Sequence, residues 1–265
     1  MLYTINLLRN KIKFSFTLAE GAMHTDLPPI KMKLGFTLAE VLITLGIIGV
    51  VAAMTIPNLI ANNKAQKLRS QFLKSYSVVQ QVFKQMEADD ISLTPSDYNP
   101  NKGSSKFYKT FIKFLQAPMD CGGSSTDSLP KNALPCYYTA EASTMKQYKI
   151  FDGKKTLAYN YLDDGQIVLQ DGTNLFFENS ISTDYIWISV DLNGYKNPPN
   201  RWGYDLFTFQ FKEGELVTMG DPKTDYSDLS KYCNINSSDN LNGIACAQKA
   251  KTDTEYFKWV VKNIK

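Results

Sequence analysis

The sequence predicts an α+β protein in which a long N-terminal helix, half transmembrane and half amphipathic, packs on a C-terminal antiparallel β-sheet. Three observations predict this fold class. Residues 36–56 form a run of 21 residues in which Glu40 is the single charge, apolar side chains then recur at helical spacing, and alternation of period two begins near residue 156. We expect four segments: a leader at 1–35, a transmembrane helix at 36–57, its amphipathic continuation at 58–90, and a globular head at 91–265.

The apolar run is long enough to cross a bilayer. A hydrocarbon core of about 30 Å needs about 20 apolar residues, because an α-helix rises about 1.5 Å per residue. Secretory signal peptides have a shorter core of about 7–15 residues and end it with a cleavage site. Here the small residue Gly35 precedes the run, so a cut after it leaves the membrane helix on the mature protein.

The residues at the start of this run resemble the prepilin N-terminus of type IV pilins and type II secretion pseudopilins. The matching residues are Lys31, Lys33, Gly35, Phe36, Thr37, Leu38, Ala39, Glu40 and, after the apolar stretch, Pro57. The resemblance covers about a tenth of the chain. It implies a pilin-like fold, cleavage of the Gly35–Phe36 bond by a membrane prepilin peptidase, and methylation of the new Phe36 amine by the same enzyme.

Glu40 fits a filament subunit for a physical reason. An acidic side chain at the centre of a transmembrane helix costs about 2.5–3.5 kcal/mol, but the cost falls near the end of the span. In an assembled filament Glu40 can meet the positive amine of Phe36 on a neighbouring subunit. The alternative is that Glu40 only extends towards the lipid headgroups. With Gly35 and Phe36 in register, we favour the role in assembly.

The charge pattern places the leader in the cytoplasm. The leader holds five basic and two acidic residues; 29 less 5 leaves 24 basic, and 26 less 2 leaves 24 acidic residues in the mature part. The basic excess before the span agrees with the positive-inside rule. A neutral head has no surplus of basic side chains to bind phosphate groups, so we expect no nucleic-acid partner. The only histidine, His24, lies in the leader, so histidine-dependent catalysis and imidazole–zinc sites are excluded from a cleaved chain.

After Pro57 the helix is expected to resume, with a kink because proline lacks a backbone donor. Apolar residues recur three or four positions apart and form one stripe: Leu68, Phe72, Tyr76, Val79, Phe83 and Met86. The stripe could be a coiled-coil seam, but we favour packing against the protein's own head. Asp89 and Asp90 begin the segment that ends the helix.

The head is predicted to hold a short amphipathic helix at 104–116, an antiparallel sheet, and a terminal helix at 251–264. A hairpin is predicted from strands at 156–162 and 166–170 around Asp163-Asp164-Gly165. Asp171-Gly172 is a second turn, which leads into 173–178. Further strands are predicted at 184–192, 205–211 and 216–220.

The loop from Asp191 to Asp205 is similar to the proline- and glycine-rich loop of major pseudopilins, which carries a Trp-Gly pair and binds calcium in some of those proteins. Asp191, Asn193 and Asp205 supply oxygen ligands of the type that calcium prefers. Three candidates are too few without carbonyl or water ligands. The alternative is a loop held by Asx turns and prolines, and we favour that alternative.

Four cysteines allow three disulfide pairings. The absence of a Cys-x-x-Cys spacing argues against zinc, and a head outside the inner membrane lies in an oxidising space. We expect the local pairs Cys121–Cys136 and Cys233–Cys246. Each closes a loop of about 15 residues, worth about 3 kcal/mol in the chain-entropy account. The second pair resembles the C-terminal disulfide loop of type IV pilins.

Together these features predict a structural subunit of a type II secretion pseudopilus rather than an enzyme. Its expected partners are the prepilin peptidase, copies of itself and other pseudopilins in a filament, the inner-membrane assembly platform, and membrane lipid. The head is expected in the periplasm or exterior. Trp202-Gly203 favours the pseudopilin, whereas the C-terminal cysteine pair favours a type IV pilin or minor pilin. A membrane-anchored ligand-binding protein is the alternative of another class. No cofactor other than calcium is expected.

Overall fold

The computed structural model describes residues 35–98, 107–122, 136, 148–179 and 185–264. Its first element is helix α1, Leu38–Ala88, whose 51 residues continue through Pro57 without a break. The chain forms two compact units, residues 1–50 and 51–265, so α1 begins in the first and ends in the second. The fold class is α+β, as the sequence predicts.

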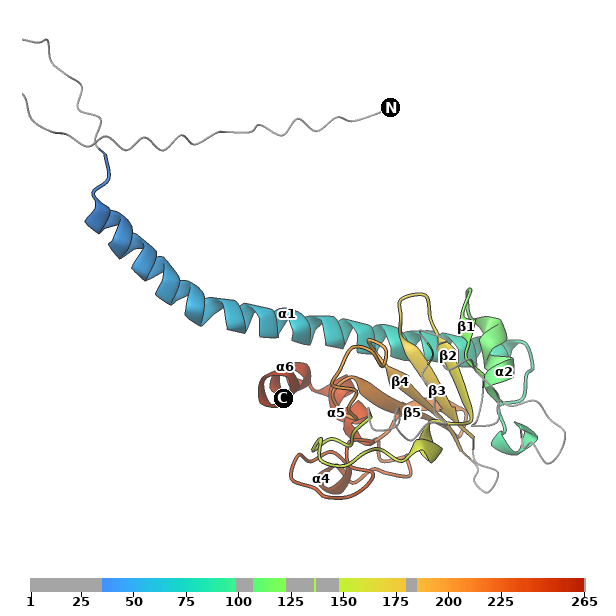
Figure 1. Ribbon diagram of the computed structural model, residues 1–265. Coiled ribbons are helices and arrows are strands. Elements are labelled where there is room, and N and C mark those ends of the chain that lie inside the picture. The colour runs from blue at the N-terminus through green and yellow to red at the C-terminus, as the bar shows by residue number, and fades with distance from the viewer. Residues whose placement is uncertain (1–34, 99–106, 123–135, 137–147, 180–184, 265) are drawn as a thin grey trace, which may run out of the picture. The chain divides into compact units, whose positions relative to one another are not determined.

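The second unit contains one six-stranded antiparallel sheet in which neighbours in sequence are neighbours in space (Figure 1). This order is a simple meander, because each strand turns back beside the one before it. The strands are β1 Met119–Asp120, β2 Gly165–Val168, β3 Asn174–Glu178, β4 Ile186–Asp191, β5 Leu206–Lys212 and β6 Glu215–Thr218.

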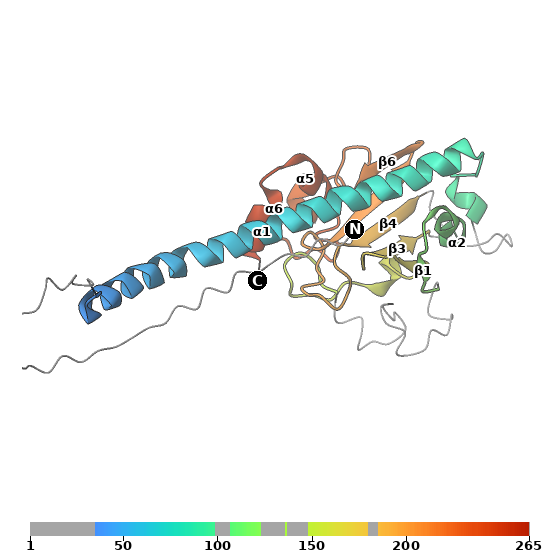
Figure 2. The ribbon, with the colours of Figure 1, turned by 90° about the horizontal axis from the view of Figure 1, so that it is seen from above.

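The amphipathic half of α1 packs on this sheet (Figure 2). Its buried residues are Ala65, Leu68, Phe72, Ser75, Val79, Val82, Phe83 and Met86. The Phe72 ring meets the Phe207 ring edge-on at 4.9 Å between centroids, and the Phe83 ring stacks on Phe211 at 4.4 Å. Strand β5 therefore lies against α1. The apolar stripe of α1 packs on the protein's own head, which is the alternative that we favoured from the sequence.

The predicted hairpin around residues 163–165 is wrong. Residues 156–162 form no strand; Thr156 makes an isolated bridge to Lys149, and a 3-10 turn, η4, covers Tyr159–Tyr161. Strand β2 pairs instead with β3 through the Asp171-Gly172 turn. The Asp164 carboxylate accepts the Asn179 N–H at 2.8 Å, so Asp164 holds the end of β3 rather than a tight turn.

Short helices complete the second unit. The predicted helix at 104–116 is present as α2, Phe107–Phe111, and a 3-10 extension, η3, Ile112–Phe114, while residues 104–106 lie outside the described residues. A 3-10 turn, η1, covers Pro95–Tyr98. The C-terminal part has α4, Leu229–Tyr232, α5, Cys246–Thr252, and α6, Tyr256–Asn263, which is the predicted terminal helix.

Candidate functional site

The first residues of α1 form a capping box. The Thr37 N–H and hydroxyl both donate to Glu40 Oε2 at 2.8 Å, and the Glu40 N–H donates to Thr37 Oγ1 at 3.2 Å. This reciprocal pattern satisfies backbone donors that a helix start leaves unpaired. Glu40 therefore has a partner within its own chain, which the sequence analysis missed although Thr-x-x-Glu is the usual signal for it. Just before the box, Gly35 and Phe36 are both exposed.

The apolar half of α1 is exposed along its length. Its large side chains include Phe36 at 88 % exposed, Met54 at 69 % and Ile60 at 62 %. Pro57 lies inside this exposed stretch. A soluble helix would bury such a surface, because large exposed apolar patches are rare in soluble monomers. Among the described residues, α1 is the one helix long and apolar enough to cross a membrane.

The loop after β4 is held by the carboxylate of Asp191. Its Oδ2 accepts the Tyr148 hydroxyl at 2.6 Å, and its Oδ1 accepts the N–H groups of Asn193 at 3.2 Å and Gly194 at 3.0 Å. These last two bonds make an Asx turn at the start of the loop. Asp191 is fully buried, and this burial raises its pKa above the usual range of an aspartate.

Asp205 holds the other end of the loop. Its Oδ2 accepts the Asn200 N–H at 3.0 Å and its Oδ1 accepts the Arg201 N–H at 2.7 Å. Burial, and then the charge of Asp191, raise the pKa of Asp205 above its usual range. The charge of Asp191 thus opposes ionisation of Asp205, and protonation of Asp205 relieves this repulsion.

The three predicted calcium ligands are brought to one loop, but their carboxylate oxygens are already used. All four oxygens of Asp191 and Asp205 accept hydrogen bonds from the chain. Asn193 Nδ2 donates to the Asn197 carbonyl at 2.6 Å, and its buried Oδ1 has no partner among the residues that the structure describes. The described residues contain no group of three or more His, Cys, Asp or Glu side chains placed to hold a metal. This arrangement favours the loop-holding role, and calcium binding stays a prediction.

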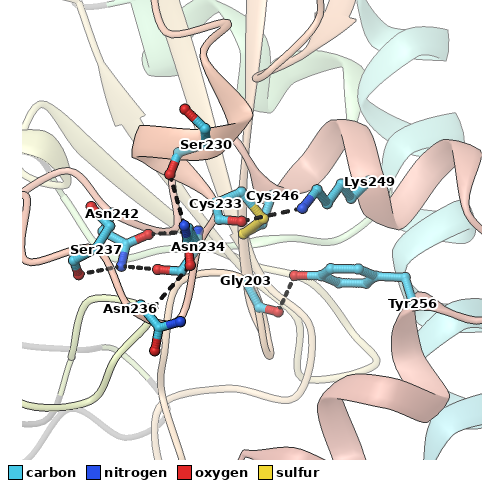
Figure 3. The surroundings of a disulfide bond; sticks show 10 residues. All are labelled: Gly203, Ser230, Cys233, Asn234, Asn236, Ser237, Asn242, Cys246, Lys249 and Tyr256. Atoms are coloured by element: carbon cyan, nitrogen blue, oxygen red, sulfur yellow. Dashed lines mark hydrogen bonds between the residues drawn. A yellow bond between two sulfur atoms is a disulfide. The ribbon is translucent and has the colours of Figure 1, made fainter.

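The Trp-Gly pair of this loop packs against the C-terminal disulfide. Trp202 is fully buried and its Nε1 donates to Thr208 Oγ1 at 3.1 Å. Gly203 has φ +76°, and a Cβ there would lie 2.9 Å from Cys246 Sγ. The Tyr256 hydroxyl donates to the Gly203 carbonyl at 2.6 Å (Figure 3). Only glycine allows this approach, so the loop, the disulfide and α6 form one packed unit.

Both cysteine pairs lie at disulfide distance in the local pairing that the sequence predicts. The Cα–Cα distance is 5.6 Å for Cys121–Cys136 and 4.9 Å for Cys233–Cys246. The Asn242 side chain sits inside the second loop, where its Nδ2 donates to the carbonyl of Asn234 (Figure 3). This hydrogen bond supports the loop from within, in addition to the disulfide that closes it.

Strand β3 carries a buried carboxyl that the sequence analysis did not single out. Burial, and then the charges of Asp164 and Asp163, raise the pKa of Glu178 to about 9. Glu178 Oε2 and the Nε1 of Trp187 opposite it are buried without partners among the described residues. The only sequence signal for this buried carboxyl is an acidic residue, Glu178, at the end of an apolar strand.

A scan against protein-family models and searches of curated proteins and of solved structures found no match to this chain. The functional interpretation therefore rests on the N-terminal sequence pattern and on the geometry described above. That pattern covers residues 31–57, whereas the geometry extends over the described head.

Proposed function

We propose that the chain is a prepilin-class structural subunit that is cut after Gly35 and assembled into a type II secretion pseudopilus. The observation that carries this proposal is the division of α1. The helix is exposed and apolar up to Ile60, and from Ala65 it becomes the buried spine of the head. Such a subunit can pack its apolar half against identical helices while its head stays outside the bundle.

The proposed processing site is open to an enzyme. Gly35 is exposed, and no other part of the described chain lies within 4 Å of the position where a Cβ would stand. The new amine on Phe36 would lie four residues before Glu40, the last residue of the capping box, and is proposed to pair with Glu40 of a neighbouring subunit. The prepilin peptidase, sibling pseudopilins and the inner-membrane assembly platform are the partners of this proposal, and membrane lipid surrounds the span before assembly.

The head is proposed to act mechanically and not as a catalyst. The mature chain would have no histidine, and all four cysteines are joined in disulfides. The packing of Trp202-Gly203 against Cys233–Cys246 supports a rigid head. One observation favours the second candidate, a type IV pilin or minor pilin, because the ordered Cys233–Cys246 loop resembles the C-terminal loop of those proteins.

Co-expression with a prepilin peptidase in a host membrane tests the proposal. The wild-type chain should lose the mass of 35 residues, and Gly35→Ala should be cut several times more slowly. Gly46→Ala is the matched control, because that glycine also has open space around it and lies inside the apolar run. Equal cutting of Gly35→Ala and wild type would remove the assigned bond.

A further inference from the structure

One of the three tryptophans differs from the other two. Trp187 and Trp202 are 1 % and 0 % exposed, whereas Trp259 on α6 is 43 % exposed. Trp259 is also one of the few large apolar side chains exposed outside α1 among the described residues. The head therefore presents one partly exposed indole to its surroundings.

The exposed face of α6 combines this indole with lysines. Tyr256, Phe257 and Val260 are buried against the head, and Lys258, Trp259 and Lys262 are exposed. The Lys258 ammonium lies 2.9 Å from Glu255, in an exposed pair that contributes little to stability. A tryptophan flanked by lysines is typical of the membrane–water interface, where the indole lies at headgroup level and the lysines extend to phosphate.

Contacts place α6 at the end of the head that follows the apolar half of α1. The Phe257 ring lies 5.9 Å from the Phe72 ring, and Arg69 donates to the Asp253 carbonyl at 3.3 Å, just before α6. Figures 1 and 2 both show α6 beside α1. Arg69 follows Ile60, the last large exposed apolar residue of the run, by nine residues, about 14 Å along a helix.

The charge at this end is complementary to an anionic surface. Residues 61–70 and 253–263 together contain five basic side chains against two acidic ones. The basic ones are Lys64, Lys67, Arg69, Lys258 and Lys262, and the acidic ones are Asp253 and Glu255. A lysine or arginine near an anionic membrane contributes about 1 kcal/mol to binding.

Apolar surface continues beside the indole. The Trp259 ring lies 6.4 Å from the Phe151 ring and borders a hollow of about 570 Å³, which Leu229 and Ile235 also line. We favour a lipid surface over a small ligand for this hollow, because its lining includes Lys249 beside the exposed Trp259.

We propose that Trp259, Lys258 and Lys262, with Lys64 and Lys67 on α1, form a docking surface for the anionic headgroups of the bilayer that α1 spans. The proposal rests on the membrane span given under the proposed function and adds a second contact between the head and the lipid. Docking orients the head of the unassembled subunit against the membrane. Extraction into a filament then exposes this surface.

The native tryptophans provide the test. The full chain is reconstituted in vesicles of phosphatidylcholine and phosphatidylglycerol that carry a doxyl quencher close to the headgroup. Wild-type emission should shift to shorter wavelength and be quenched, and Trp259→Phe should lose the quenching while Trp187 and Trp202 still emit. The control Leu73→Ala, a half-exposed position elsewhere on α1, should be quenched as wild type.

A charge variant tests the role of the lysines. Lys258→Glu with Lys262→Glu should lower the quenching constant in anionic vesicles at least about twofold. Lys113→Glu with Lys223→Glu is the charge-matched control, because both lysines are exposed and lie away from α6, Lys113 beside α2 and Lys223 beside Glu215. The control should be quenched as wild type.

The outcomes separate this proposal from the one on which it rests. Failure of the chain to float with vesicles overturns the membrane span and the docking surface together. Flotation with equal quenching of wild type and Trp259→Phe overturns the docking surface alone. Equal quenching in pure phosphatidylcholine vesicles, with no effect of the charge variant, overturns the assignment of anionic lipid as the partner.

Discussion

Substitution of Phe72 by alanine tests the packing of α1 on the head. Phe72 is fully buried in the contact between α1 and the sheet. Its ring contacts Phe207 at 4.9 Å, Phe209 at 5.7 Å and Phe257 at 5.9 Å between centroids. The Phe72 ring is surrounded by side chains from β5 and α6, so its removal leaves a cavity between these two elements and α1.

Phe→Ala substitutions in cores cost about 3–5 kcal/mol. We expect a loss of about 4 kcal/mol in the free energy of unfolding, because three ring contacts disappear and two of them are edge-on contacts that are worth about 0.5–1.5 kcal/mol each beyond the area buried. Domain stabilities are about 5–15 kcal/mol, so the variant remains folded but much weakened. For a head of this size the melting temperature should fall by about 8–16 °C.

The assay is urea unfolding of the full chain in detergent, followed by the emission of the buried tryptophans. Leu73→Ala is the matched control, since Leu73 is the next residue on the same helix and is 39 % exposed; it should cost less than about 1 kcal/mol. A loss for Phe72→Ala that equals that of Leu73→Ala would refute the packing and would restore the coiled-coil interpretation of the stripe.

Further predictions concern the Cys233–Cys246 disulfide, the loop between Asp191 and Asp205, and Glu40. Replacing Cys233 and Cys246 by alanine should lower stability by about 3 kcal/mol, measured by urea unfolding; an unchanged midpoint would show that the loop is held by its hydrogen bonds alone. The pKa of Asp205 is raised to about 8 in the folded state, so its contribution to stability is full below the unfolded pKa of about 4 and is lost as the pH rises towards 8. Asp205→Asn should therefore flatten the fall of the urea midpoint between about pH 4 and 8, and an unchanged slope would contradict the raised pKa. If calcium binds to the loop between Asp191 and Asp205, added calcium should raise the urea midpoint of the wild type most near pH 8. Glu40→Val should leave cleavage largely intact and impair assembly, measured by sedimentation of filaments, whereas wild-type incorporation would show that the pairing with Phe36 does not matter.

Helical periodicity predicted the spine of the head correctly because one side of α1 meets one large apolar surface. Leu68, Phe72, Val79 and Met86 are buried as the stripe requires. Tyr76 is only half-buried, and its hydroxyl donates to the Leu216 carbonyl at 2.8 Å. The late strands were also predicted, since their turns contain glycine at positions that need positive φ.

The hairpin at 156–165 could not be rejected from sequence, because the decisive contacts are distant. Gly165 lies in a strand, where a Cβ would stand 2.3 Å from the Tyr108 ring. The local sequence pattern assigns Asp164-Gly165 to a turn. The contact with Tyr108 of α2, which is distant in sequence, shows that the glycine is needed for close packing. Likewise, the repulsion between Asp191 and Asp205 depends on their shared burial, although they are 14 positions apart.

Processing of the chain after Gly35 is tested by the mass of the N-terminal peptide from protein in its native membrane. We expect a mature chain that begins with N-methylated Phe36. A chain that begins at Met1, Met23 or Met32, in a cell with an active prepilin peptidase, would show that the Gly35–Phe36 bond is not cut and that α1 is an ordinary membrane anchor.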